Sequence, residues 1–391
     1  MTGAQQECPP LPPGVPRRPG TSPAAPPPGR FARAFELFTT KAAFPYQAAV
    51  VRIGFGLTWT GFLLREWPNR RVLYGDRSPW SDELAARLLA ENHAFTVLSW
   101  YHGRLWFELV YHLAIVAAVL FTLGWRTRAS GVLFLVTVLS LQNRAVFAGD
   151  GGDNVIHLMA VYLVFTRCAR VWSLDARRAR DGGAVWLWAL LGLVLLLGPT
   201  GLTSSAGPAG PVGLLWVPWA VAGLWWAVNR SLPGSEWRDV PDALANMLHN
   251  CAMAVIAGQV VLIYSTAGWY KVQGSRWQDG TALHYPLHLD YFTPWPGLSG
   301  VLGAGLLPVF LLSYGTVITQ VAFPFTLANR RVKNVLLAVM MAEHAGIAVT
   351  LGLPFFSLAM IAADAVFLPT SALLRVGRGA RALGHRWRRE P

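Results

Sequence analysis

Apolar residues occur in long runs along the chain, and short polar connections separate these runs. A helix needs about 20 predominantly apolar residues to cross a bilayer, and the runs have lengths of this order. The ten runs cover residues 44–64, 105–124, 128–147, 153–168, 184–200, 212–229, 247–270, 300–327, 335–351 and 355–369. This pattern predicts an all-α fold, a polytopic transmembrane helix bundle.

The fifth and sixth runs have the weakest helical pattern. Pro199 and the stretch 201–211 interrupt them with residues that end or bend helices. We therefore interpret residues 182–230 as an extra hydrophobic hairpin and expect about 8–10 membrane helices. A hairpin adds two crossings, so its presence does not change the sidedness of the other segments.

Both ends of the chain lack long apolar runs. Residues 1–33 are rich in proline without hydrophobic periodicity, which predicts a disordered tail. No apolar stretch of signal-peptide type follows Met1, so the first membrane segment is expected to act as its own signal. Residues 371–391 are predicted to form a basic tail, which leaves 34–370 as the transmembrane domain.

The composition agrees with a membrane protein. Hydrophobic residues make up 53% of the chain and charged residues only 14%, whereas soluble domains have about 25% charged residues. The 18 tryptophans fit the aromatic belts of membrane interfaces. Arginine greatly outnumbers lysine, and alanine, glycine and proline are abundant, which is typical of a high-GC bacterial proteome. The predicted location is therefore a bacterial plasma membrane.

The net charge of +13 is spread over short connections between the apolar runs. This distribution excludes a nucleic-acid-binding module and follows the positive-inside rule, which predicts that the basic side and both termini are cytoplasmic. Counting crossings places these basic residues on that side: Arg126, Arg128, Arg167, Arg170, Arg177, Arg178, Arg180, Arg230, Arg238, Arg330, Arg331 and Lys333. Residues 65–104 are an exception, because they carry several arginines on the opposite side. Within this segment, Ser81-Asp82-Glu83 predicts the start of a capped amphipathic helix.

Ionisable residues inside the apolar runs are candidates for chemistry, because each costs several kcal/mol in hydrocarbon unless it has a partner or lines a watery cavity. They are Arg52, Glu108, His112, Asp153, His157, Glu343, His344 and Asp364. For each, a buried polar contact between helices is the structural alternative. For Arg52 we expect such a structural role with a carboxylate partner.

Metal and disulfide chemistry is not expected. Cys8, Cys168 and Cys251 fall on or near the predicted cytoplasmic side and form no CxxC pair. His284 and His288 have i, i+4 spacing, but Pro286 between them breaks a helix, so no metal site is predicted.

Lys271 closes the seventh run and is the only lysine on the predicted outer side. It could be a snorkelling anchor beside aromatic residues, or a base at an apolar boundary. Under the second interpretation Lys271 is the candidate catalytic base, and Tyr264, Trp277, Asp279 and His284 are candidate substrate-binding residues around it. His157, Glu343 and His344 are the candidate proton relay.

The stretch from Tyr264 to Ala282 resembles a segment of the HTTM membrane family, which includes the vitamin K-dependent gamma-carboxylases. The family motif is a tyrosine, an Ala-Gly pair, a lysine, and a tryptophan with a following glycine. Further similar segments are 51–54, 151–154, 172–175 and 346–360. The resemblance spans residues 44–370 without 182–230, and it is closest to the SdpB-like bacterial branch.

The resemblance implies two activities. The SdpB-like branch implies maturation or export of a secreted peptide at the extracytoplasmic face, with that peptide and co-encoded membrane factors as partners besides the lipid bilayer. The carboxylases imply a base, here Lys271, that deprotonates reduced menaquinone or vitamin K. They show two adjacent lysines where this chain has Tyr270-Lys271, and a large luminal domain where only a basic tail follows Pro369.

A proton-coupled transporter is the third alternative, because intramembrane acidic and histidine residues fit a proton path. Against it, the sequence shows no pair of broken helices in matching halves. The sequence leaves open whether the protein is an enzyme and which substrate and cofactor it uses.

Overall fold

A computed structural model describes residues 29–92, 94–101, 103–177, 189, 192, 216–231 and 239–387. All regular structure in these residues is helical and none of them forms a β-strand, which confirms the all-α prediction. The chain divides into a short unit, Met1–Leu37, and a main unit, Phe38–Pro391, to which the following description applies. Residues 1–28 and most of 182–215 lie outside the described residues, so disorder of the tail up to Pro28 and the first half of the hairpin stay predictions. Arg30–Arg33, the end of the predicted tail, instead begin helix α1 (Arg30–Thr40).

Five of the described helices are long and apolar enough to cross a membrane. They are α2 (Pro45–Glu66), α5 (Arg104–Leu123), α10 (Asp239–Gln273), α14 (Leu306–Thr326) and α15 (Arg330–Thr350). A sixth candidate is broken: α16 (Pro354–Asp364) and η7 (Ala365–Phe367) are followed, after a 115° bend, by α17 (Thr370–Trp387). The protein is therefore a helical membrane protein.

The remaining helices are shorter or less apolar. The third and fourth predicted runs form α6 (Thr127–Arg144) and α7 (Gly151–Val164), and the second half of the hairpin forms α9 (Trp216–Ser231). The others are α1 (Arg30–Thr40), α3 (Arg70–Leu73), α4 (Asp82–Glu91), η1 (Val97–Ser99), η2 (Val146–Ala148), η3 (Asp175–Arg177), α11 (Ser275–Gln278), α12 (His284–Leu287), η6 (Asp290–Phe292) and α13 (Pro296–Gly303). The expected count of 8–10 crossings stays a prediction.

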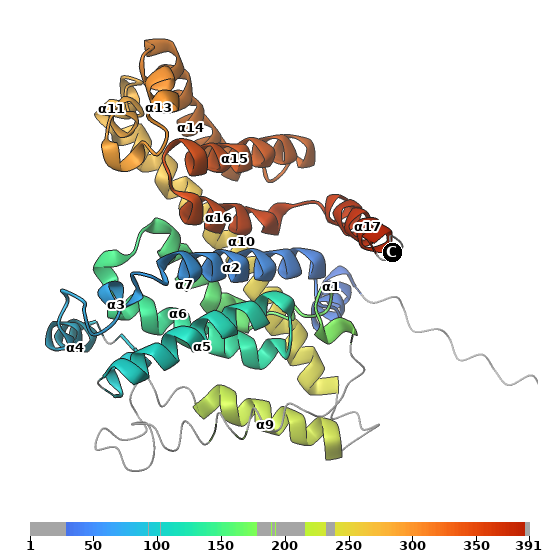
Figure 1. Cartoon of the computed structure of the whole chain (residues 1–391). Helices are drawn as coiled ribbons and strands as arrows, with labels where there is room; N and C mark the ends of the chain where they lie inside the picture. Colours follow the sequence, from blue (N-terminus) through green and yellow to red (C-terminus); the bar gives the residue numbers. More distant parts are fainter. Residues whose placement is uncertain are drawn as a thin grey trace, which may run out of the picture. The chain divides into compact units, whose positions relative to one another are not determined.

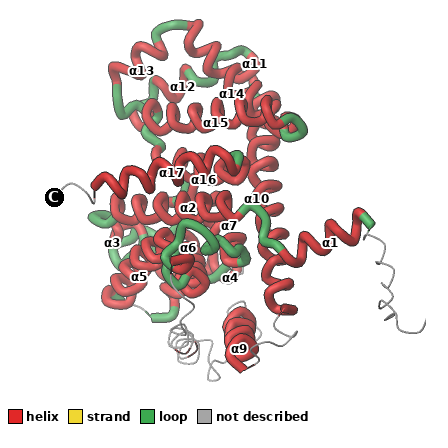
Figure 2. Tube along the Cα trace, turned by 90° about the vertical axis from the view of Figure 1, so that its right-hand side faces the viewer, coloured by secondary structure: helices red, strands yellow, loops and turns green. Residues whose placement is uncertain are grey.

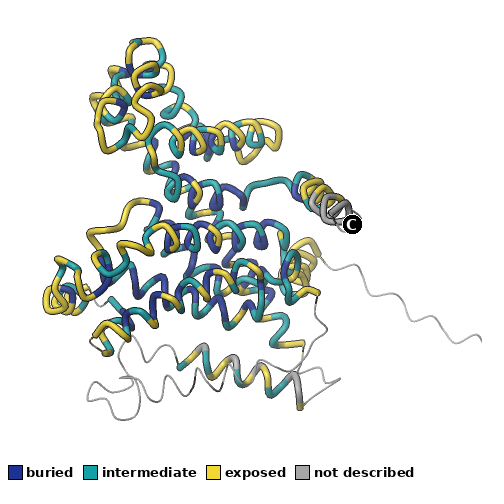
Figure 3. The backbone as a smooth tube through the Cα atoms, viewed as in Figure 1, coloured by how far each residue is buried: buried dark blue, intermediate teal, exposed yellow. Residues whose placement is uncertain are grey.

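The core lies where α2 packs against α5, α7 and α16 (Figures 1 and 2). Within the apolar part of each helix, 61% of α2 is buried but only 17% of α15. Figure 3 shows the same contrast, with the buried positions concentrated in the α2 layer. The exposed positions of α14 and α15 include Leu311, Ile318 and Val335, as expected for helices that face lipid.

Arg52 is fully buried in α2 and has a structural role. Its guanidinium donates to the backbone oxygens of Phe121 (2.7 Å), Thr122 (2.9 Å) and Trp172 (2.6 Å). The predicted carboxylate partner is wrong: Arg52 satisfies carbonyls at the C-terminal end of α5, where orphan carbonyls and the helix dipole favour a cation.

One end of the bundle gathers connections that are distant in sequence. Gln47 donates to the oxygen of Leu368 (2.8 Å), and Lys333 donates to that of Phe367 (2.5 Å). Asp175, the first residue of η3, accepts from the backbone of Arg126 (2.8 Å), which joins the segment after α7 to the α5–α6 turn. We call this the basic end; its charged residues include Arg126, Arg128, Arg167, Arg170, Arg330, Arg331 and Lys333.

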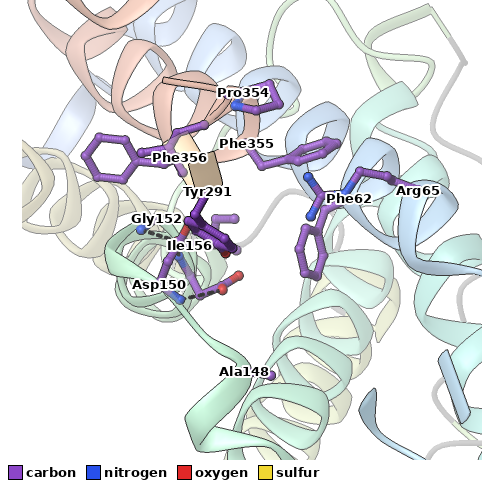
Figure 4. Close-up of a pocket in the computed structure, with 13 residues that line it drawn as sticks. Phe62, Arg65, Ala148, Asp150, Gly152, Ile156, Tyr291, Pro354, Phe355 and Phe356 are labelled. Atoms are coloured by element: carbon purple, nitrogen blue, oxygen red, sulfur yellow. Dashed lines mark hydrogen bonds between the residues drawn. The ribbon is translucent and has the colours of Figure 1, made fainter. Parts of the chain in front are cut away.

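The opposite end, which we call the cavity end, contains the connections that the sequence places outside. Arg65, Asp150, Tyr291 and Gly352, from four different connections or helix ends, line one cavity of about 320 Å³ (Figure 4). Their convergence agrees with the predicted alternation of crossings. Which end faces the cytoplasm stays a prediction.

The amphipathic helix predicted at Ser81 is confirmed as α4, at the cavity end. The Ser81 hydroxyl accepts from the Leu84 amide (3.2 Å) and caps the helix, in which only Ala85 is buried. Arg144, at the end of α6, donates to Asp82 (2.8 Å) and ties α4 to the bundle.

Candidate functional site

The Ala-Gly pair of the motif allows α10 to approach α14 closely. A Cβ atom on Gly268 would lie 2.8 Å from the Val321 Cγ2 atom and 3.2 Å from the Val321 backbone nitrogen. Only glycine therefore fits this crossing, as is common where membrane helices pack closely. The close approach brings the last turn of α10, with Lys271, against the polar pair Thr319-Gln320 of α14.

Lys271 is the first residue of a polar chain across three helices, which we call the Lys271 chain. Its Nζ donates to Gln320 Oε1 (2.8 Å), and Gln320 Nε2 donates to Glu343 Oε1 (3.1 Å). The Thr319 hydroxyl donates to the other oxygen of Glu343 (3.1 Å). The Lys271 Nζ also lies 5.2 Å from the ring centre of Trp277. The amine is thus engaged by protein groups.

Tyr264, His344 and Asp364 form a second group, which we call the Tyr264 cluster. The Tyr264 hydroxyl lies 3.0 Å from both Asp364 Oδ2, to which it donates, and His344 Nε2. A hydroxyl has one proton, so in this arrangement His344 Nε2 is the donor to the tyrosine oxygen. All three side chains are buried, and His344 Nδ1 and Asp364 Oδ1 have no hydrogen-bond partner among the residues that the structure describes.

The two groups lie at successive levels of the wall formed by α10, α14, α15 and α16. Lys271 and Tyr264 are separated by two turns of α10, roughly 10 Å along its axis. Glu343 and His344 are adjacent on α15 and belong one to each group. Polar side chains therefore extend in two groups from the end of α10 at the cavity end towards the interior of the bundle.

Two of the predicted substrate-binding residues have local partners. Asp279 accepts from the amide (2.9 Å) and hydroxyl (2.5 Å) of Thr281, and this hydrogen bonding holds the pKa of the carboxyl below its usual range. The His284 ring lies 4.1 Å from that of His288. Asp279 and His284 have no hydrogen bond with the Lys271 chain. Of the other two predicted substrate-binding residues, Trp277 contacts Lys271, and Tyr264 lies two turns away on α10.

His157, the third predicted relay residue, lies on α7. Its Nδ1 atom is 3.1 Å from Gln142 Oε1 of α6, and it does not join the Lys271 chain. Asp153 is used in the capping box of the same helix with Asp150. The structure thus places the relay candidates in two regions, with Glu343 and His344 near Lys271 and His157 apart from them.

The cavity is a feature that sequence reasoning missed. Phe62 and Phe355 flank Arg65, whose guanidinium carbon lies 4.7 Å from the Phe355 ring centre (Figure 4). Phe356 lines the same cavity and lies 5.7 Å from the His344 ring. Phe356 therefore borders both the cavity and the Tyr264 cluster.

Among the described residues, no group of three or more His, Cys, Asp or Glu side chains could hold a metal ion. Comparisons with protein families, curated proteins and solved structures gave no match. The HTTM resemblance therefore rests on the residues quoted from the sequence, and the geometry around Lys271 carries the functional argument.

Proposed function

We propose that the protein is a multi-pass membrane protein of the HTTM/SdpB-like type that acts in maturation or export of a secreted peptide at its extracytoplasmic face, with Lys271 as the base of its working site. The observation that carries the proposal is the hydrogen bond from Lys271 Nζ to Gln320, which in turn binds Glu343. It joins a lysine of the motif to a carboxylate on a different helix.

The Lys271 chain favours a chemical role over a membrane anchor. A snorkelling lysine extends its amine into water and headgroups, whereas this amine points to α14. Gln320 separates the amine from the Glu343 carboxylate, so among the described residues Lys271 has no direct ion pair. A neutral amine in this position accepts a proton from a bound substrate, and Glu343 then stabilises the resulting ammonium through Gln320.

The position of Lys271 suits a substrate that arrives at the membrane surface. Trp277 provides an aromatic face beside the amine, and α11–α13 form the connection that follows it. A peptide segment or a lipid-soluble molecule can meet the amine there without crossing the bundle.

The peptide proposal is tested by comparing secreted peptides, by mass spectrometry, from cells that carry the wild type, Lys271→Ala or Lys41→Ala. Lys41 is an exposed lysine outside the site and provides a matched control. We expect the mature mass of at least one peptide to disappear with Lys271→Ala alone. Identical peptide profiles from all three strains would overturn the proposal.

A quinone-dependent, carboxylase-like enzyme is the second candidate, and the Trp277 ring beside the Lys271 amine favours it. Lys271 would bind a hydroquinone hydroxyl and Trp277 its ring, while Gln320 orients the amine. A reduced quinone supplies oxygen-dependent base chemistry when bound. Quinone epoxide formed from reduced menaquinone and oxygen in wild-type and Lys41→Ala membranes, but not in Lys271→Ala membranes, supports this candidate; equal epoxide from all three contradicts it.

A further inference from the structure

Helix α17 leaves the direction of the bundle. The axis turns by 115° between Pro354–Phe367 and Thr370–Gly379. Because α16 packs along α2 and α15, a bend of this size directs α17 across the end of the bundle. Figure 1 shows α17 nearly along its own axis while α2, α15 and α16 run across the picture.

The first turns of α17 are fixed to the basic end. Gln47 of α2 donates to the Thr370 hydroxyl (3.0 Å), and Leu373 is buried. A Cβ atom on Gly377 would lie 2.8 Å from the Trp172 ring, so the helix passes directly over this tryptophan. The direction of α17 is therefore set by contacts with the bundle.

The two faces of α17 differ in chemistry. At 100° per residue, Arg375 and Arg378 share one side of the helix, and Leu373 and Val376 share the other. Both arginines are exposed, and Val376 is 65% exposed although it is apolar. Within the described part of the chain, no hydrogen bond or ion pair engages the guanidinium of Arg375 or Arg378.

The charge around α17 is predominantly positive. Residues 370–391 contain six arginines and one acidic residue, Glu390. The basic end, over which α17 runs, adds the cations of the α5–α6 turn and the start of α15. An arginine face beside an exposed apolar residue, on a helix across the ends of membrane spans, is typical of helices that lie in the headgroup region.

We propose that α17 lies in the interface of the bilayer at the basic end, with Arg375 and Arg378 binding the phosphates of anionic phospholipids. The partner is a lipid surface because the same helix exposes Val376 and directly follows the apolar segment formed by α16 and η7. This inference is independent of the proposed chemistry at Lys271. The lipid contact also holds the end of α16, the helix that carries Asp364 of the Tyr264 cluster.

The proposal is tested on the full-length protein in detergent by native mass spectrometry, with phosphatidylglycerol or phosphatidylcholine of the same acyl chains as probes. The variants are Arg375→Gln/Arg378→Gln, the charge-preserving Arg375→Lys/Arg378→Lys, and Arg104→Gln/Arg276→Gln. The last pair removes the same charge from the cavity end, where both arginines are exposed.

Each surface arginine contributes about fivefold to anionic lipid binding, so the first variant is expected to bind phosphatidylglycerol roughly 30-fold more weakly. Phosphatidylcholine binding by that variant, and phosphatidylglycerol binding by the other two, should stay near wild type. The proposal is overturned if Arg375→Gln/Arg378→Gln binds phosphatidylglycerol as tightly as the wild type does. It is also overturned if Arg104→Gln/Arg276→Gln loses as much affinity for phosphatidylglycerol as Arg375→Gln/Arg378→Gln.

Discussion

Gln320 is the residue that connects the candidate base to its carboxylate. Its side-chain amide accepts from Lys271 and donates to Glu343, and it is only 6% exposed. An amide can bridge an amine and a carboxylate in this way because it has both a donor and an acceptor.

Replacing Gln320 by leucine should therefore inactivate the site while keeping its volume. We expect Gln320→Leu to lower the rate of the Lys271-dependent reaction by about 10²-fold, the order of a general-base contribution. The assay is the peptide or epoxide measurement described above. Thr326→Val, on the same helix but at the basic end, is the control and should retain activity. A fully active Gln320→Leu protein would show that Glu343 does not act through Gln320.

Gly268→Ala should destabilise the protein by pushing α10 away from α14. The added Cβ meets the Val321 backbone nitrogen at 3.2 Å, so the cost is about 1–3 kcal/mol, as for overpacked cores. Gly258→Ala is the matched control on the same helix, because no described residue lies within 4 Å of its added Cβ. Unfolding temperatures in detergent should fall only for Gly268→Ala, and equal values for the two variants would contradict the close approach.

The sequence allowed some of these residues to be predicted but not their partners. Lys271, Glu343 and His344 are visible because a charge or an imidazole in an apolar run is conspicuous. Gln320 is neutral and lies in an apolar run, so hydropathy does not single it out, although its neighbour Thr319 is a weak signal. The pairing of Tyr264 with Asp364 spans 100 residues of sequence and depends on how α10 and α16 cross.

At the scale of the helix, the length of an apolar run predicts where a membrane segment lies. It does not predict the polar turns that extend the helix beyond the run. The run at 44–64 corresponds to α2, but α10 begins at Asp239, well before the predicted residue 247. The extra turns carry polar residues that bind neighbouring segments: Asn246 accepts from Arg167 (2.8 Å). The predicted single segment 300–327 is in fact α13 and α14, which are separated at Gly305.

The connection after α3 contains an exposed ion pair that should depend on pH. Arg71 donates to both oxygens of Asp76 (2.9 and 2.5 Å), and these hydrogen bonds lower the pKa of Asp76 to about 2. The folded-state pKa lies below the unfolded value of about 3.9. The ion pair therefore stabilises this connection fully when the pH is above about 3.9. This stabilisation is lost as the pH falls through about 2.

The measurement is the unfolding temperature of the wild type and of Asp76→Asn, followed from neutral pH down to about pH 2. The wild type should be slightly more stable at neutral pH, and the difference should close in the acid range. A difference that is unchanged at every pH would mean that Asp76 does not act through its charge.

At the scale of the whole molecule, connections that are distant in sequence meet at the two ends of one bundle. The cavity joins the ends of α2 and α15 to the start of α7, and hydrogen bonds join the starts of α2, α10 and α15 to their neighbours at the basic end. The basic end is predicted to face the cytoplasm, because basic connections are retained on that side.

Cysteine accessibility tests this orientation. A thiol reagent that does not cross membranes should label Arg276→Cys in intact cells and label Arg331→Cys only after the membrane is opened. Both positions are exposed and lie at opposite ends of the bundle. The reverse pattern would show that the basic end faces outward, which would place Lys271 on the cytoplasmic side and contradict the proposed site of action.

The hydrogen bond between the Lys271 amine and Gln320 supports the proposed function most directly, and it can be measured without a substrate. The chain has only three lysines, Lys41, Lys271 and Lys333. After ¹³C reductive methylation, each dimethylamine should give its own NMR signal in detergent. We predict that Gln320→Leu shifts the Lys271 signal and leaves those of Lys41 and Lys333 in place. A Lys271 signal that matches the signal of the exposed Lys41 and is unchanged by Gln320→Leu would contradict the hydrogen bond between Lys271 and Gln320.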